Sequence, residues 1–298
     1  MKNLFCFGLG YTASYTADYF IKKGWFVTGT SRDISKINNI DKKINLITYD
    51  PKNQKSDFMR HIKDIDILLI SIAPDDGGDI VIQNNNEDII EIFKNKIQRV
   101  IYLSTTAVYG DTGGKAIDEN YPTYPKSERA INRVKAENAW VDLAKRFGIK
   151  YDILRLSGIY GNERNQLINL VRGHAKRIIK KGHVFNRIHV EDIAQIIYKL
   201  SVSKLSSDIY NISDDFAAPP QDVVEYAAKK LNIAPPPEIA FKSANLSPMA
   251  RSFYSETKII LNSKIKKALN YDLMFPNYKS GINNILSIHY KKHLNKDN

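Results

Sequence analysis

Short runs of β-branched and aromatic residues alternate along this chain with longer segments of helical periodicity. Within 127–147, Ala136, Trp140, Leu143 and Phe147 recur at i, i+4, i+7 and i+11, which marks the buried face of a helix. Alternation of strands and helices is typical of βαβ units, so the sequence predicts an α/β fold with a doubly wound parallel sheet. The expected strands are 3–7, 25–28, 44–49, 65–70, 99–103, 151–154 and 209–212, and the expected helices are 12–23, 85–96, 127–147 and 190–201.

The chain changes character after about residue 213, where prolines interrupt it at short intervals. Proline ends helices and lacks a backbone donor, so we expect short helices and irregular connections here. We predict a large domain formed by 1–157 plus 188–212 and a smaller, discontinuous substrate lobe formed by 158–187 plus 213–298. The prolines concerned are Pro219, Pro220, Pro235, Pro236, Pro237, Pro248 and Pro276.

The composition is that of a folded globular chain, because 43% of its 298 residues are hydrophobic and 26% are charged. Lys and Arg outnumber Asp and Glu by 44 to 32, a net charge of +12, but the basic residues are spread along the chain. The two concentrations, 176–181 and Lys291-Lys292, are more typical of solvated faces than of a nucleic-acid surface. We therefore predict no nucleic-acid partner.

One cysteine and the lengths of the apolar runs bear on location. Cys6 has no partner within the chain for a disulfide, which fits a reducing compartment. Residues 1–13 imitate a signal peptide but contain two glycines, and no apolar run approaches the ~20 residues of a membrane span. We expect a cytoplasmic protein with no membrane association. His174 and His183 lack the spacing of metal ligands, so no metal site is predicted.

The first predicted strand ends in Gly8-x-Gly10-x-x-Ala13 and leads directly into a predicted helix. Small residues in this context let the backbone turn sharply and approach a pyrophosphate, while the helix N-terminus supplies free N–H groups. The pattern predicts a Rossmann-type site for a nicotinamide dinucleotide at Gly8, Gly10, Tyr11, Thr12 and Ala13. A tight turn between strand and helix with no ligand is the alternative.

The end of the second predicted strand indicates which dinucleotide is bound. An acidic residue at this strand tip reads the ribose 2′-hydroxyl of NAD, whereas an arginine accommodates the 2′-phosphate of NADP. The chain has Thr30, Ser31 and Arg32 there, which favours NADP, with NAD as the alternative. Asp33, the next residue, is the observation that favours NAD.

Four segments then carry a resemblance to a known family. Residues 104–110, Ser-Thr-Thr-Ala-Val-Tyr-Gly, are similar to the signature of extended short-chain dehydrogenases/reductases, and 118–119, 155–161 and 187–194 resemble later segments of that family in order. Nearly the whole chain is covered. It resembles an atypical member, of the kind described as NAD(P)-dependent epimerase/dehydratase-like, and the resemblance implies that Ser104 lies beside the cofactor.

The same resemblance implies further cofactor contacts. Asp50 after the third strand matches a residue that meets the adenine amine, and Ala73-Pro74 after the fourth strand matches a segment under the ribose. Ser157 and Tyr160 follow the sixth strand and are expected to face the nicotinamide. Ordinary turns at Asp50 and at Ala73-Pro74 are the alternative.

The family's catalytic Tyr-x-x-x-Lys pair is missing from this sequence. In the family a Glu stands eight residues after that Tyr and a Gly about nineteen after it, and Glu137 and Gly148 place the two positions at Arg129 and Arg133. The tyrosine hydroxyl relays a proton as hydride moves. Arginine stays protonated, so Arg129 and Arg133 are expected to polarise a carbonyl or hold an anion.

A shifted register would pair Ile131 with Lys135 and still lack the phenol. Thr105 is expected to keep its role as a hydrogen-bond donor to the reacting oxygen. A replacement phenol could come from the loops, where four tyrosines are candidates: Tyr109, Tyr121, Tyr124 and Tyr160.

The function expected from these features is an NADP-dependent oxidoreductase, epimerase or dehydratase-like enzyme acting on a small polar substrate. Five arginines in segments expected near the cleft suggest an anionic substrate, and the resemblance suggests a nucleotide-linked sugar. The alternative is a non-catalytic NADP-binding regulatory protein that lost the proton relay. A monomer or homodimer is expected in either case. The arginines are Arg129, Arg133, Arg155, Arg164 and Arg187.

Overall fold

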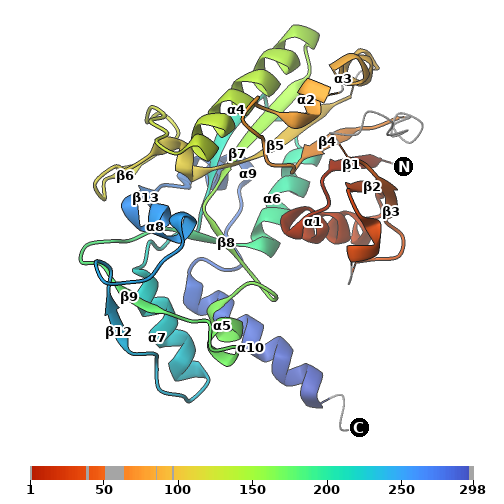
Figure 1. The fold of residues 1–298 in the computed structure, drawn as a ribbon. Helices are drawn as coiled ribbons and strands as arrows, with labels where there is room; N and C mark the ends of the chain where they lie inside the picture. Colours follow the sequence, from red (N-terminus) through yellow and green to blue (C-terminus); the bar gives the residue numbers. More distant parts are fainter. Residues whose placement is uncertain (1, 38–39, 51–63, 85, 96, 295–298) are drawn as a thin grey trace. The chain divides into compact units, whose positions relative to one another are not determined.

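The computed structural model of this chain describes residues 2–37, 40–50, 64–84, 86–95 and 97–294 (Figure 1). The chain forms two compact units, each built from separate stretches of sequence. The first comprises Met1–Val108, Thr123–Arg155 and Ile193–Tyr210, and the second comprises Tyr109–Pro122, Leu156–Asp192 and Asn211–Asn298.

A seven-stranded parallel sheet organises the first unit, in the order β11-β7-β5-β4-β1-β2-β3. The chain runs from β1 through β2 to β3 at one edge and then returns to β4 on the other side of β1. The strand order therefore reverses between β1 and β4, which is where open α/β sheets bind ligands. The strands are β1 (Asn3–Phe7), β2 (Phe26–Ser31), β3 (Asn45–Thr48), β4 (Ile67–Ile70), β5 (Arg99–Thr105), β7 (Lys150–Leu156) and β11 (Asp208–Ile212).

Helices cover both faces of this sheet (Figure 1). Because side chains alternate along a strand, Phe5 and Phe7 of β1 point to the same face, where they join one hydrophobic cluster with α2 (Ile80–Asn84), α3 (Asn86–Lys94) and α4 (Glu128–Phe147). On the opposite face, α1 (Tyr11–Lys22) and α6 (Val190–Val202) meet through an edge-on contact of Phe20 with Tyr198. The predicted doubly wound α/β fold is confirmed.

Local residues determine where the helix α4 begins and ends. The Ser127 hydroxyl accepts a hydrogen bond from the Ala130 N–H at 3.3 Å and caps the first turn. Gly148 ends the helix with φ at 66°, a left-handed conformation that glycine adopts without strain. The predicted apolar face of Ala136, Trp140, Leu143 and Phe147 packs into the hydrophobic cluster.

The second unit has short strands in pairs and a separate core. Leu167, Ala227 and Ile282 bring α5, α7 and α10 together in this core. The paired strands are β10 with β8, β12 with β9 and β13 with β6. The elements are β6 (Ala116–Ile117), β8 (Gly158–Tyr160), β9 (Arg177–Ile179), β10 (Arg187–His189), β12 (Glu238–Ala240), β13 (Ile259–Ile260), α5 (Gln166–Val171), α7 (Pro220–Lys230), α8 (Pro248–Ser255), α9 (Ser263–Leu269) and α10 (Tyr278–Leu294).

The division between units differs from the predicted one, and the two longest differences are 109–122 and 188–192. Residues Tyr109–Pro122 belong to the second unit, because Ala116 and Ile117 pair in parallel with Ile259 and Ile260. The stretch 188–192 also belongs to it, because β10 pairs with β8. In the part of the chain described, no helix is long and apolar enough to span a membrane.

Candidate functional site

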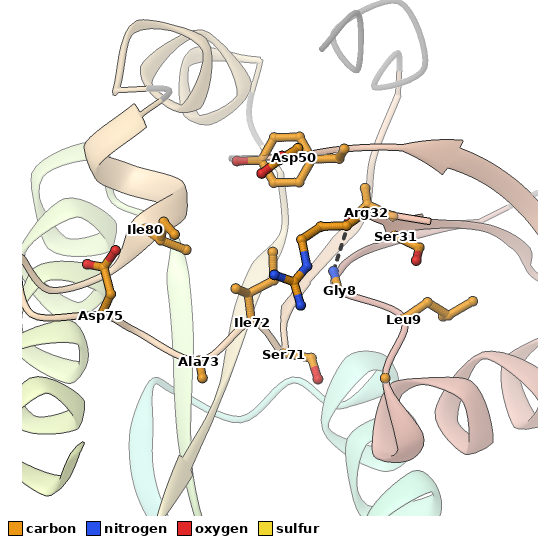
Figure 2. A pocket seen from close by; sticks show the side chains of 13 residues that line it. Gly8, Leu9, Ser31, Arg32, Asp50, Ser71, Ile72, Ala73, Asp75 and Ile80 are labelled. Atoms are coloured by element: carbon orange, nitrogen blue, oxygen red, sulfur yellow. Dashed lines mark hydrogen bonds between the residues drawn. The ribbon is translucent and has the colours of Figure 1, made fainter. Parts of the chain in front are cut away.

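A cavity of about 480 Å³ opens at the carboxyl ends of β1, β2, β3 and β4, in the first unit (Figure 2). It lies at the point where the strand order reverses, the place where ligands bind in open α/β sheets. The cavity brings together seven of the fourteen residues predicted for the cofactor. It is lined by Gly8, Leu9, Gly10, Thr30, Ser31, Arg32, Tyr49, Asp50, Ser71, Ile72, Ala73, Asp75 and Ile80.

Gly8 is required by the protein itself. Its φ is +87°, and a Cβ there would lie 2.6 Å from Ile72 Cγ1 and 3.2 Å from Ile72 N. The Gly8 N–H donates to Thr30 Oγ1 at 2.8 Å, and the Leu9 N–H donates to the Thr30 carbonyl at 2.7 Å. Thr30 is fully buried, and its hydroxyl holds this turn at the wall of the cavity.

Gly10 presents the opposite case. Its φ of −83° and ψ of −172° suit any residue, and a Cβ there would meet no protein atom within 4 Å. Nothing in the described protein demands glycine, yet a side chain would fill the space in front of α1. That helix has no side-chain cap and no acidic residue in its first turn, which leaves its N-terminal N–H groups available to an anion. Thr12 and Ala13 are buried, so a contact from them would involve the backbone.

At the end of β2, the side chains of Arg32 and Asp33 have different surroundings. Asp33 accepts hydrogen bonds from Ser35 N at 3.1 Å and Ser35 Oγ at 2.6 Å, and it pairs with Lys36 at 2.9 Å. These contacts hold the pKa of Asp33 below its usual range and commit its carboxylate to the turn. The Ser31 hydroxyl donates to the Asp33 carbonyl at 3.0 Å. Arg32 remains, and Figure 2 shows its side chain extending into the cavity.

Two further predicted residues line the cavity, Asp50 after β3 and Ala73 after β4 (Figure 2). Pro74 follows Ala73 but is not part of the lining, and Pro51 lies outside the described residues. Sequence reasoning missed six lining residues that flank the predicted ones or follow the same strands. They are Leu9, Tyr49, Ser71, Ile72, Asp75 and Ile80.

Comparison with known protein families shows which family this chain belongs to. The sequence model of the NAD-dependent epimerase/dehydratase family matches residues 8–213, which include the cavity and the signature segments. The chain belongs to this family. The resemblance drawn from the four sequence segments is thereby confirmed.

Relatives of this epimerase/dehydratase chain extend over nearly its full length. Protein YeeZ of Escherichia coli K12 is 28% identical over 287 residues, 93% of this chain and 97% of YeeZ. A conserved protein of unknown function from Silicibacter pomeroyi DSS has a solved structure that is 38% identical, with a TM-score of 0.88 over 96% of this chain and 99% of that one. The UDP-glucose 4-epimerase of Thermus thermophilus, solved in complex with NAD, shares the fold at 15% identity, with a TM-score of 0.76 over 95% and 98% of the two chains.

The hydroxyl groups of Ser104 and Thr105, at the end of β5, have different surroundings. The Ser104 hydroxyl is buried and donates to the Glu137 carboxylate. Arg155 donates to the same carboxylate, from Nη2 at 2.8 Å and from Nε at 3.2 Å. The Ser104 hydroxyl is thus engaged within the protein. Thr105 is half-buried, and its Oγ1 accepts from the Ala107 N–H at 3.2 Å, which leaves its hydroxyl proton free to donate.

The helix α4 lies against β5 through the face that carries Arg133 and Glu137. Arg133 Nη1 donates to the Leu103 carbonyl at 2.7 Å and to the Tyr102 hydroxyl at 3.0 Å. Lys135 is exposed and Ile131 is 38% exposed. Of the two registers, the one with Arg133 at the lysine position is therefore next to the end of β5. Arg129 is exposed one turn earlier.

Two of the candidate phenols are committed to packing in the second unit. The Tyr109 hydroxyl donates to Asn211 Oδ1 at 2.7 Å. Tyr160 lies in the hydrophobic core with Tyr278, and its hydroxyl is 3.4 Å from the Asn277 carbonyl oxygen. Burial raises the pKa of Tyr160 above its usual range. Its surroundings give Tyr160 a packing role in the second unit.

Ser157 and the remaining candidate tyrosines, Tyr121 and Tyr124, differ in burial and contacts. Ser157 is buried and its N–H donates to the Ile212 carbonyl at 2.9 Å. Tyr121 packs edge-on against Tyr109, and Tyr124 is 60% exposed. Among the described residues, no three His, Cys, Asp or Glu side chains gather as they would around a metal ion.

Proposed function

We propose that this chain binds NADP(H) in the cavity of its first unit and acts as an NAD(P)-dependent oxidoreductase or epimerase/dehydratase-like enzyme. The observation that carries the proposal is the end of β2, where Arg32 extends into the cavity while Asp33 is bound to Ser35 and Lys36. A cation at this strand tip, where the adjacent acid Asp33 is bound elsewhere, favours a 2′-phosphate over a 2′-hydroxyl. NAD remains the alternative cofactor.

The cofactor supplies the hydride carrier, and the chain's own residues position it. The backbone of Gly8, Gly10 and the first turn of α1, Tyr11 to Ala13, would hold the pyrophosphate, because space and free N–H groups lie there. Arg32, supported by Ser31, would pair with the 2′-phosphate. Asp50 would meet the adenine, and Ala73 with Pro74 would lie along the ribose.

Titration of the whole chain with NADPH and NADH tests this assignment. We expect NADPH to bind at least about tenfold more tightly, a difference of ~1.4 kcal/mol that one charge-assisted contact can supply. Arg32→Ala should remove the preference. Lys36→Ala is the matched control, since it removes a nearby cation that is paired with Asp33 and is absent from the cavity lining. Equal affinities for the two cofactors in the unmodified chain would overturn the NADP assignment.

For catalysis we propose a small polar substrate, with a nucleotide-linked sugar as the leading candidate. The support is the family together with fold relatives solved with such molecules, including MoeE5 in complex with UDP-glucose and NAD. Thr105 would donate to the reacting oxygen, and Arg129 and Arg133 would stabilise negative charge on it. Neither arginine can relay a proton, so the proton must come from another group or from water.

A non-catalytic NADP-binding regulatory protein is the second candidate. The position of Arg133 favours it, because this side chain is tied to Leu103 and Tyr102 where the family has a catalytic lysine. In either case we propose a cytoplasmic monomer or homodimer.

Turnover with NADPH and a panel of UDP-sugars separates the two candidates. If the chain is an enzyme, Thr105→Ala should lower turnover by about 10²–10⁴-fold, whereas Thr105→Ser should retain most of it. A regulatory protein would bind NADPH and show no turnover to lose. In that case Arg129→Tyr combined with Arg133→Lys should create weak activity, and continued inactivity would contradict the register on α4.

A further inference from the structure

Arg187 in β10 is a nearly buried cation that lacks an ion pair. Its side chain is only 7% exposed, and no carboxylate oxygen of the described residues lies within 4.0 Å of its guanidinium. Asp214, a nearby acid, accepts from the backbone N–H of Arg187 at 3.1 Å and from Asn186 Nδ2 at 3.4 Å. Asp214 attracts the Arg187 guanidinium electrostatically but forms no direct ion pair with it, and burying a charge without a direct partner is costly, so this arrangement calls for an explanation.

The hydrogen bonds of Arg187 do not supply that explanation. Its Nη1 donates to the carbonyls of Phe185 at 3.3 Å and Ala218 at 3.2 Å. These carbonyls are already satisfied, because Ala218 N donates to Phe185 O at 3.1 Å and Phe185 N donates to Ala218 O at 3.4 Å. Among the described residues, Nε and Nη2 of Arg187 have no acceptor, and neither nitrogen is sealed from solvent.

Aromatic rings hold the guanidinium in a fixed plane. Its central carbon lies 3.8 Å from the centroid of the Phe185 ring and 6.0 Å from that of Tyr278. Burial lowers the pKa of Arg187 to about 10, which leaves it charged at neutral pH. A planar donor pair held against apolar rings binds oxyanions well, because little rotamer entropy is lost and the local dielectric is low.

We propose that Nε and Nη2 of Arg187 form an oxyanion subsite in the second unit, which takes a phosphate or carboxylate group of a small-molecule ligand. This inference rests on the proposed function only where it identifies that ligand as the enzyme's substrate. If the ligand is the substrate, the substrate carries a phosphate or carboxylate group. The binding step itself needs only residues of the second unit: Arg187, Phe185, Ala218 and Tyr278.

The test uses the full chain carrying Gly10→Val, because the cofactor cavity could otherwise bind the same anions. Calorimetric titration with inorganic pyrophosphate and with citrate separates a phosphate source from a carboxylate source. We expect saturable binding of at least one of them, weakened at least about tenfold by Arg187→Gln. Arg187→Lys should retain part of the affinity, since it keeps the charge but loses the fork. Arg172→Gln, which changes an exposed arginine of the same unit, should bind as the parent does.

Thermal unfolding of Arg187→Met separates a binding role from a structural one. The carbonyls keep their backbone donors and a buried charge is removed, so the unfolding midpoint should stay the same or rise while anion binding is lost. A fall in the midpoint would overturn the proposal, as would absence of binding to the parent or equal binding to Arg187→Gln. NADPH titration of the chain without Gly10→Val reports on the proposed function separately, so either idea can fail alone.

Discussion

The two glycines of the β1–α1 turn should respond in opposite ways to substitution. Gly8 has a φ of +87° and a Cβ there would press on Ile72, whereas Gly10 has an extended backbone with open space in front of it. We therefore compare Gly8→Ala with Gly10→Val in the full chain. The first should lower stability, and the second should lower cofactor binding.

The magnitudes follow from the geometry. An alanine at Gly8 meets the cost of a left-handed conformation, roughly 1–2 kcal/mol, before the shift that Ile72 must make to relieve its 2.6 Å contact. A substitution at Gly10 carries no such cost and should change the free energy of unfolding by no more than about 1 kcal/mol. For a domain of this size 1 kcal/mol corresponds to roughly 2–4 °C in the melting temperature.

Thermal unfolding followed by circular dichroism and calorimetric titration with NADPH measure the two effects. Gly10→Val should melt close to the unmodified chain and bind NADPH at least about tenfold more weakly, because its side chain fills the volume proposed for the pyrophosphate. Unaltered NADPH binding by Gly10→Val would refute the placement of the pyrophosphate. A large drop in its melting temperature would refute the claim that the protein itself does not need glycine there.

Three other substitutions test the roles of Glu137, Asp214 and Asp33. Glu137→Gln leaves Arg155 buried without its carboxylate and should cost about 3–5 kcal/mol in denaturant unfolding; a loss below 1 kcal/mol would contradict the pairing. Burial raises the pKa of Asp214 to about 7, so the folded state keeps a proton that the unfolded state loses, and stability falls as pH rises from about 4 to 7. Asp214→Asn should lack this fall in melting curves taken across that range, and parallel curves for the two proteins would argue against it. Asp33→Asn should change the NADPH to NADH affinity ratio by less than about twofold, since its carboxylate faces Ser35; a larger change would show that Asp33 reads the ribose.

The sheet and the turn at Gly8 could be predicted because local patterns determine them. Strand and helix periodicities placed β1, β4 and α4 close to their observed limits, and the glycine pattern located one wall of the cavity. Those signals depend on residues within a few positions of one another. They also sufficed to identify the family.

Two features could not be predicted from local sequence patterns. One is the pairing of strands that are distant in the sequence, and the other is whether a polar side chain binds a ligand or another protein group. The two-residue strand Ala116–Ile117 pairs with Ile259 and Ile260, more than 140 positions later in the chain. No local sequence pattern predicts this partner. Asp33 and Ser104 have side chains suited to a ligand, but each is bound by a protein group, Ser35 and Glu137 respectively. Tyr160 likewise fits a signature motif while its ring packs in a hydrophobic core.

A crystal structure of the full chain with NADPH would show directly whether the first unit binds this cofactor as proposed. We expect the pyrophosphate against the backbone from Gly8 to Ala13, the 2′-phosphate paired with the Arg32 guanidinium within about 3 Å, and the adenine beside Asp50. NADPH bound elsewhere, or bound in this cavity with its 2′-phosphate away from Arg32 and its ribose against Asp33, would contradict this expectation.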